Sequence, residues 1–165
     1  MCSSARILRK KGVNGVNDVK EQKALGERGA HKMREENMTF GQFIKRKRIQ
    51  DPRELTLKDM SAVMGMSLSM LSDVEQGRRR AWDADKIETF CSYLELSSED
   101  KALMYDLAAK NKNEIPSDID DTFLHSEVGN MARMALRMTN EGVASEEDWK
   151  TFIRKLEENR GKMRD

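Results

Sequence analysis

The amino-acid sequence predicts an all-α protein, and three observations lead to that prediction. Apolar residues recur at the i, i+3, i+4 and i+7 spacing of a helix face in several stretches, such as 87–94. Serine and threonine, which cap helix N-termini well, stand directly before several of these stretches. Charged residues make up 36% of the chain and aromatic residues 5%, which suits a small helical protein with a thin core. A chain of 165 residues allows one domain, or one domain with an appendage.

The chain is organised around residues 56–77, which predict two short helices joined by a tight turn. Thr56 is a good N-cap residue, and Asp59 completes a capping box three residues later. Gly65 can take the left-handed conformation that ends a helix, Ser67 is a second N-cap, and Gly77 closes the second helix. The core-facing positions are Leu57, Met60, Ser61 and Met64 in the first helix and Leu71 and Val74 in the second.

A helix, a short turn containing glycine and a second helix are the sequence form of a helix-turn-helix. This segment resembles the helix-turn-helix of phage-repressor-like regulators, the Cro/cI or XRE family. The resemblance runs from about Thr39 to Leu107 and rests on Met60-Ser61, Gly65-Met66-Ser67, Leu71-Ser72 and Val74-Glu75-Gln76-Gly77. It implies a five-helix repressor-like helix-turn-helix domain that binds double-stranded DNA.

Charge and periodicity divide the chain into three parts. Residues 1–37 have a net charge of +4 and lack sustained periodicity, so we interpret them as a disordered basic segment. Two alternatives stay open for this segment: a basic arm that reaches DNA, or a start of translation at Met33 or Met38. Residues 38–111, with a net charge of 0, correspond to the Cro/cI-type DNA-binding domain. Residues 112–165, with a net charge of −3, form a helical tail for dimerisation or partner binding.

Five helices are expected in the domain, near residues 39–49, 56–64, 67–76, 83–94 and 98–108. Asn111 to Glu114 is a polar linker, and Pro116 is well placed at the first position of a tail helix. Gly142 stops the next helix, whose apolar stripe is Val128, Met131, Ala132 and Ala135. Ser145 caps the last helix, whose inner face is Trp149, Phe152, Ile153 and Leu156. Such a tail is too small to bury a good core alone, so it must pack on the domain, on a second copy or on a partner.

The second helix of the motif would be the recognition helix, whose first residues reach base edges in the major groove. The expected base contacts are Ser67, Leu68, Ser69, Ser72 and Asp73. Serine can bond to several bases, leucine can meet a thymine methyl, and aspartate can accept from cytosine N4. The alternative for Ser67 is that it only caps the helix, and the alternative for Leu68 is that it lies partly in the core.

Two basic clusters are expected to contact phosphates. Lys45 to Arg48 form a cationic run at the end of the first helix. The alternative is that they are a solvated helix end, where cations interact favourably with the helix dipole. Arg78 to Arg80 directly follow Gly77, and arginine binds phosphate in a bidentate manner. The expected phosphate contacts are Lys45, Arg46, Arg48, Lys58, Arg78, Arg79 and Arg80.

Two residues depart from the family pattern. Leu57 stands where a glutamine often contacts phosphate, and Asp73 stands where Arg or Lys is common. Both departures lower the DNA affinity expected of a single domain. A further hypothesis is therefore a helical scaffold protein that has lost DNA binding.

The leading interpretation is a sequence-specific transcriptional regulator, a repressor that binds a palindromic operator as a homodimer. The alternative is an antitoxin-like DNA-binding protein whose tail binds a toxin-like or regulatory partner protein. We expect no enzyme, because the sequence has no nucleophile–base pair, no metal-ligand spacing and no phosphate-binding glycine loop. We expect no cofactor, no metal and no membrane segment. Cys2 and Cys91 form no disulfide framework, and a reduced cytoplasm is the expected location.

Overall fold

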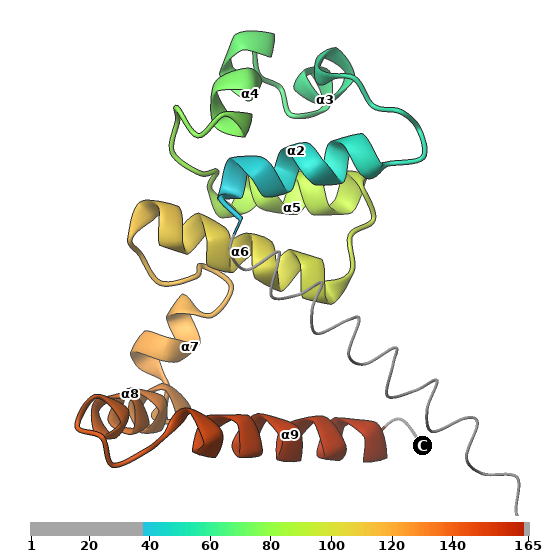
Figure 1. Ribbon diagram of the computed structural model, residues 1–165. Coiled ribbons are helices and arrows are strands. Elements are labelled where there is room, and N and C mark those ends of the chain that lie inside the picture. The colour runs from blue at the N-terminus through green and yellow to red at the C-terminus, as the bar shows by residue number, and fades with distance from the viewer. Residues whose placement is uncertain (1–37, 164–165) are drawn as a thin grey trace, which may run out of the picture.

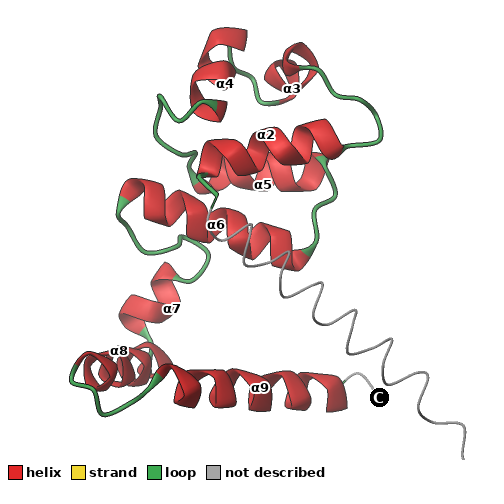
Figure 2. Cartoon of the chain, in the orientation of Figure 1, coloured by secondary structure: helices red, strands yellow, loops and turns green. Residues whose placement is uncertain are grey.

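A computed structural model describes residues 38–163, and this part of the chain consists of eight α-helices without a β-strand (Figures 1 and 2). The all-α prediction is therefore confirmed for these residues. The predicted disordered basic segment, residues 1–37, lies outside the described residues. The helices are α2 (Phe40–Gln50), α3 (Leu57–Val63), α4 (Leu68–Glu75), α5 (Ala84–Tyr93), α6 (Ser98–Lys112), α7 (Asp120–His125), α8 (Glu127–Asn140) and α9 (Glu146–Lys162).

Side-chain caps start all the described helices except α7, and those of Thr56, Ser67 and Ser145 are caps that the sequence predicts. Thr56 Oγ1 accepts a hydrogen bond from the Asp59 amide (3.2 Å), and Asp59 Oδ2 accepts one from the Thr56 amide (2.9 Å). Thr39 forms the same box with Gln42 at the start of α2, and Ser145 with Asp148 at the start of α9. Single side-chain caps come from Ser67, Asp83, Ser97 and Ser126. Each cap satisfies helix-terminal amides that lack an intrahelical partner, and is typically worth ~1 kcal/mol.

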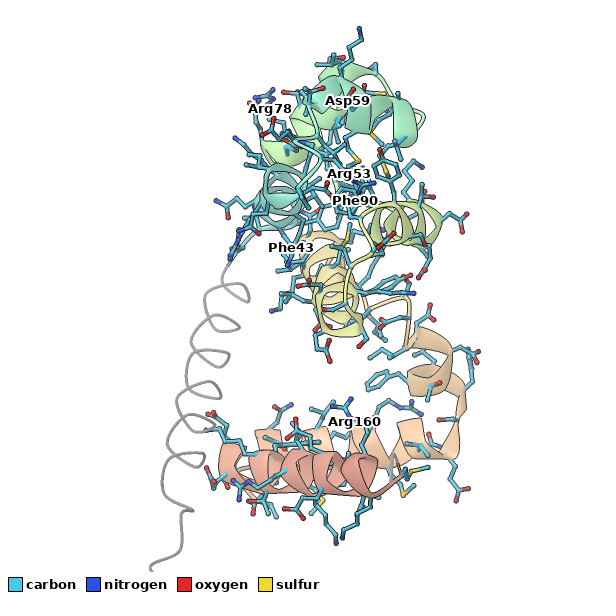
Figure 3. All side chains as sticks on the ribbon, turned by 90° about the vertical axis from the view of Figure 1, so that its right-hand side faces the viewer. Phe43, Arg53, Asp59, Arg78, Phe90 and Arg160 are labelled. Atoms are coloured by element: carbon cyan, nitrogen blue, oxygen red, sulfur yellow. The ribbon has the colours of Figure 1, made fainter. Side chains whose placement is uncertain are left out.

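Helices α2 to α6 pack around one hydrophobic core. Its completely buried large side chains are Phe43, Ile44, Met60, Leu71, Ile87, Phe90 and Met104, and Figure 3 shows Phe43 and Phe90 in this interior. Trp82, in the segment before α5, is buried edge-on against Phe40, with ring centroids 5.5 Å apart. The core therefore joins α2, the α3–α4 pair and the α5–α6 pair into one unit.

A glycine allows α2 to cross the end of α4 at close range. A Cβ atom at Gly41 would lie 2.2 Å from the Val74 carbonyl oxygen and 2.7 Å from that of Glu75. These backbone atoms cannot move aside as a flexible side chain can, so the position requires glycine. Gly41 thus fixes how α4 sits on the rest of the domain.

The tail departs from the prediction at its beginning. Helix α6 continues to Lys112 and ends at Asn113, a left-handed residue with φ of 60°, so the predicted linker from Asn111 starts two residues later. Pro116 does not begin a helix: the Ile119 amide donates to the Pro116 carbonyl (3.1 Å) in a turn, and α7 starts at Asp120. Proline suited a first helical position locally, but the chain turns there instead.

Helices α8 and α9 follow α7 at the far side of α6 from the α3–α4 pair (Figure 1). The Trp149 indole Nε1 donates to Thr139 Oγ1 (2.8 Å) and joins the start of α9 to the end of α8. The predicted inner face of α9 is not inside the chain, because Phe152, Ile153 and Leu156 are 53%, 51% and 50% exposed. None of the helices between residues 38 and 163 is long and apolar enough to cross a membrane.

Candidate nucleic-acid interface

Helices α3 and α4 form a compact pair whose geometry places the start of α4 at the surface. Residues 64–67 connect them, and Gly65 adopts the left-handed conformation with φ of +58°. The Met66 amide donates to the Ser61 carbonyl (3.1 Å), which completes the turn. Met60, Leu71 and Val74 are buried beneath the pair. With these side chains facing inward, the first turn of α4 has its other face in solvent.

The five predicted base-contact residues lie together on α4 and its N-cap. Ser67, Leu68 and Ser69 are exposed, whereas Ser72 and Asp73 are half-buried. Ser67 Oγ accepts from the Met70 amide (3.2 Å) and lies 3.1 Å from Ser69 Oγ. Ser67 is thus a cap and a surface hydroxyl at once. Leu68 is 47% exposed, so it is not a core residue.

Asp73 is paired with the arginines that follow the helix. Its Oδ1 lies 2.7 Å from Arg78 Nη2 and accepts from Arg78 Nε (2.9 Å), and its Oδ2 lies 3.8 Å from Arg79 Nε. A carboxylate predicted to read a base is therefore engaged by two side chains predicted to bind phosphate. This ion pairing reduces the positive field of the loop and holds Arg78 against α4.

Gln76 belongs to the same surface, although we did not predict it as a site residue. Its Nε2 donates to Ser72 Oγ (2.9 Å), and its Oε1 accepts from Arg78 Nη1. The i to i+4 spacing from Ser72 to Gln76 was the available signal, because residues four apart on a helix are neighbours. Gln76 thus connects the serine row (Ser67, Ser69 and Ser72) to the arginine loop (Arg78 to Arg80).

Most of the predicted phosphate contacts are exposed. Lys45, Lys58 and Arg78 to Arg80 are exposed. Gly77 follows the C-cap of α4 and has a left-handed φ of +73°, which turns the chain into the segment of Arg78 to Arg80. Figure 3 shows Arg78 at the outer edge of the domain. Arg46 is half-buried, and its Nη1 lies 3.6 Å from Met38 Sδ in an open groove along α2.

Arg48 is a correction to the predicted phosphate contacts, because it is a buried structural residue. Its side chain is 10% exposed, and its Nε and Nη2 donate to the two carboxylate oxygens of Glu75 at 2.8 and 2.9 Å. Its Nη1 donates to the Leu55 carbonyl (3.0 Å). Hydrogen bonding to Glu75 raises the pKa of the guanidinium above its usual range, against the effect of burial. Arg48 therefore holds α4 in place from below and cannot reach DNA.

The position of Leu57 also has a structural reason. Its side chain is partly buried against the core, so apolar packing occupies the place where the family pattern has a phosphate-binding glutamine. Among the predicted phosphate contacts, the exposed cations are Lys45, Lys58 and Arg78 to Arg80.

No group of three His, Cys, Asp or Glu side chains within residues 38–163 is arranged to hold a metal ion. No protein-family model matches this chain, and no curated protein or solved structure matches it either. The functional proposal therefore rests on the residues and geometry described above.

Proposed function

We propose that this chain is a sequence-specific DNA-binding regulator of transcription, a repressor of the Cro/cI helix-turn-helix class that binds a palindromic operator as a dimer. The observation that carries the proposal is the surface of α4. The exposed Ser67, Ser69 and Gln76 and the half-buried Ser72 lie beside three consecutive arginines, on a short helix held by the buried ion pair of Arg48 and Glu75. Cations on the rim and hydrogen-bonding groups at the centre are what phosphate and base contacts require.

In this proposal α4 enters the major groove by its N-terminal end. Ser69 and Ser72 have hydroxyls that can donate to or accept from base edges, and Leu68 offers an apolar surface to a thymine methyl. Arg79 and Arg80 would bind the phosphates at one edge of the groove, and Lys45 and Lys58 are further exposed cations for the backbone. Arg78 would join them when a phosphate competes with Asp73 for its guanidinium.

A comparison of two double variants tests this division of roles. Random double-stranded DNA is selected with the full-length protein and sequenced, and affinity for the recovered site is then measured across a range of salt concentrations. S69A/S72A should bind with reduced preference for the selected site over random DNA and an unchanged salt dependence. R79A/R80A should weaken binding to all sequences and lower the slope of log K against log salt by about 2.

The matched control for the arginine variant is R137A/K150A, which removes two exposed cations from α8 and α9 in the tail. Its salt slope should equal that of the unmodified protein. The division of roles is wrong if both α4-side variants change the salt slope alike. DNA binding itself is overturned if no motif is enriched at any salt concentration.

A further inference from the structure

The tail presents a large apolar surface that the described chain does not cover. On α8 the exposed side chains are Val128, Met131, Met134, Leu136 and Met138, and on α9 they are Phe152, Ile153 and Leu156. A cavity of about 570 Å³ opens between α8 and the first turns of α9, lined mainly by apolar side chains that include Met131, Ala135, Trp149 and Phe152. Monomeric proteins rarely leave contiguous apolar surface of this kind in water, and such patches mark interaction sites.

The apolar residues of α9 form one stripe along the helix. Trp149, Phe152, Ile153 and Leu156 follow the i, i+3, i+4, i+7 pattern, and Trp149 is anchored to α8 through Thr139. Phe152, Ile153 and Leu156 lie at the middle of the 17-residue helix, which extends away from its junction with α8 (Figure 1). An occupant of this surface must therefore lie along the middle of α9.

The charges of α9 are distributed with opposite signs at its two ends. Residues 146–153 contain three acids and one lysine, a net charge of −2. Residues 154–162 contain four basic residues and two acids, a net charge of +2. The acidic end is Glu146, Glu147 and Asp148, and the far basic end is Arg160 and Lys162. A helix with this distribution is complementary to an antiparallel copy of itself and repels a parallel copy at both ends.

We propose that the tail is the homodimer interface, with α9 of one copy lying antiparallel to α9 of a second copy about a two-fold axis near residue 154. In that register Phe152 of one copy packs against Leu156 of the other. The carboxylate of Glu146, at the edge of the stripe, faces the guanidinium of Arg160, which continues the stripe on the other copy. Such an interface is isologous, since one surface pairs with itself. The exposed apolar side chains of α8 in each copy extend this contact on both sides of the two-fold axis.

This inference deepens the proposed function, because a two-fold pair of tails supplies the symmetry that a palindromic operator requires. The pairing is nevertheless tested without DNA. The oligomeric state of the full-length protein, its Ile153→Glu variant and its Thr151→Glu variant is measured by sedimentation velocity from about 1 to 100 µM. Thr151 is exposed on the opposite side of α9, so Thr151→Glu adds the same charge outside the stripe.

The unmodified protein and Thr151→Glu should sediment as dimers. Ile153→Glu should raise the dimer dissociation constant by more than about tenfold, because dimerisation would then bury an unpaired carboxylate. Circular dichroism should show that Ile153→Glu keeps its helix content, since Ile153 is half-exposed in the chain. A monomer at 100 µM, or a dimer that withstands Ile153→Glu, would overturn the proposal.

Disulfide cross-linking tests the orientation in a Cys2→Ser background, where Cys91 is buried. A mixture of Glu146→Cys and Arg160→Cys proteins should cross-link between the two kinds of chain. Each protein alone should not, because equal positions lie at opposite ends of an antiparallel pair. Cross-linking of Glu146→Cys with itself would overturn the antiparallel arrangement.

The outcomes separate this inference from the proposed function. A cross-linked antiparallel dimer that enriches no DNA motif would overturn the DNA-binding proposal and leave the interface standing. A monomeric protein that still binds a DNA site would overturn the interface alone. A monomer that forms a stoichiometric complex with a purified second protein through Ile153 would replace the second copy by a partner, as in the antitoxin-like alternative.

Discussion

Arg48 of α2 donates hydrogen bonds to both carboxylate oxygens of Glu75 at the end of α4, at 2.8 and 2.9 Å. A third bond from Arg48 to the Leu55 carbonyl ties the segment before α3 to the same guanidinium. The pair is buried, and each partner satisfies the other, which is the condition under which a buried ion pair is tolerated. One side chain thus connects three segments that together position the proposed recognition helix.

We predict that breaking this pair destabilises the protein strongly. Glu75→Ala should lower the free energy of unfolding by roughly 3–5 kcal/mol, because it leaves the Arg48 guanidinium buried without its counter-charge. Urea denaturation followed by circular dichroism measures the change. The control is Lys86→Ala, which breaks the exposed pair with Asp83 (3.1 Å) and should cost less than about 1 kcal/mol. Equal costs for the two variants would contradict a special role for the buried pair.

We predict that Asp73→Asn increases the affinity for random DNA. The substitution removes a negative charge from the proposed interface and releases Arg78 and Arg79 from the carboxylate that now holds them. If Asp73 also accepts from cytosine N4, the same variant should lose preference at one position of the selected site, by roughly 1–3 kcal/mol. Fluorescence anisotropy with random and selected duplexes measures both effects. A lower affinity for random DNA would show that the ion pair supports the interface instead of restraining it.

We predict that Asp51 contributes to the loss of stability in acid. Arg53 donates to both of its carboxylate oxygens, at 2.8 and 2.7 Å, and this hydrogen bonding lowers the pKa of Asp51 to about 2. The unfolded value is about 3.9, so the stabilisation is complete above pH ~4 and is lost as the pH falls towards 2. The stability difference between the unmodified protein and Asp51→Asn should therefore shrink across this window. Urea denaturation at successive pH values measures it.

The control for this pH dependence is Asp118→Asn, which changes an exposed carboxylate in the segment before α7. Its stability difference from the unmodified protein should vary less between pH 4 and 2. A difference for Asp51→Asn that stays constant over the window would mean that the contact with Arg53 does not favour the ionised carboxylate.

We predict that Cys91 resists alkylation in the native protein. Burial raises the pKa of its thiol to about 11, and its Sγ lies 3.7 Å from Met104 Sδ inside the core. Because the thiolate is the reactive form, iodoacetamide at pH 8 should modify Cys91 at least about a hundredfold more slowly than in urea-unfolded protein. Mass spectrometry of a Cys2→Ser variant measures the rate at this one thiol. Comparable rates in the two states would show that the α5–α6 core opens readily.

Part of this structure followed from residues close together in the sequence. The capping boxes of Thr39 with Gln42, Thr56 with Asp59 and Ser145 with Asp148 form between residues three positions apart. Gly65 and Gly77 take the left-handed conformation expected of helix ends. A cap or a helix end depends on one turn of backbone, so the local sequence contains all the information that these features need.

The sequence by itself thus determined the all-α class, the starts of α2 to α6 and α9, and the residues that α4 presents at its first turn. Only the tertiary structure decided the role of Arg48. It belongs to an unbroken run of four cations, and it differs from the other three because its side chain lies where α2 meets Glu75. The tertiary structure also decided that Asp73 pairs with the arginine loop and that the apolar stripe of α9 stays uncovered in one chain. These outcomes depend on contacts between helices, whose relative placement no local pattern specifies.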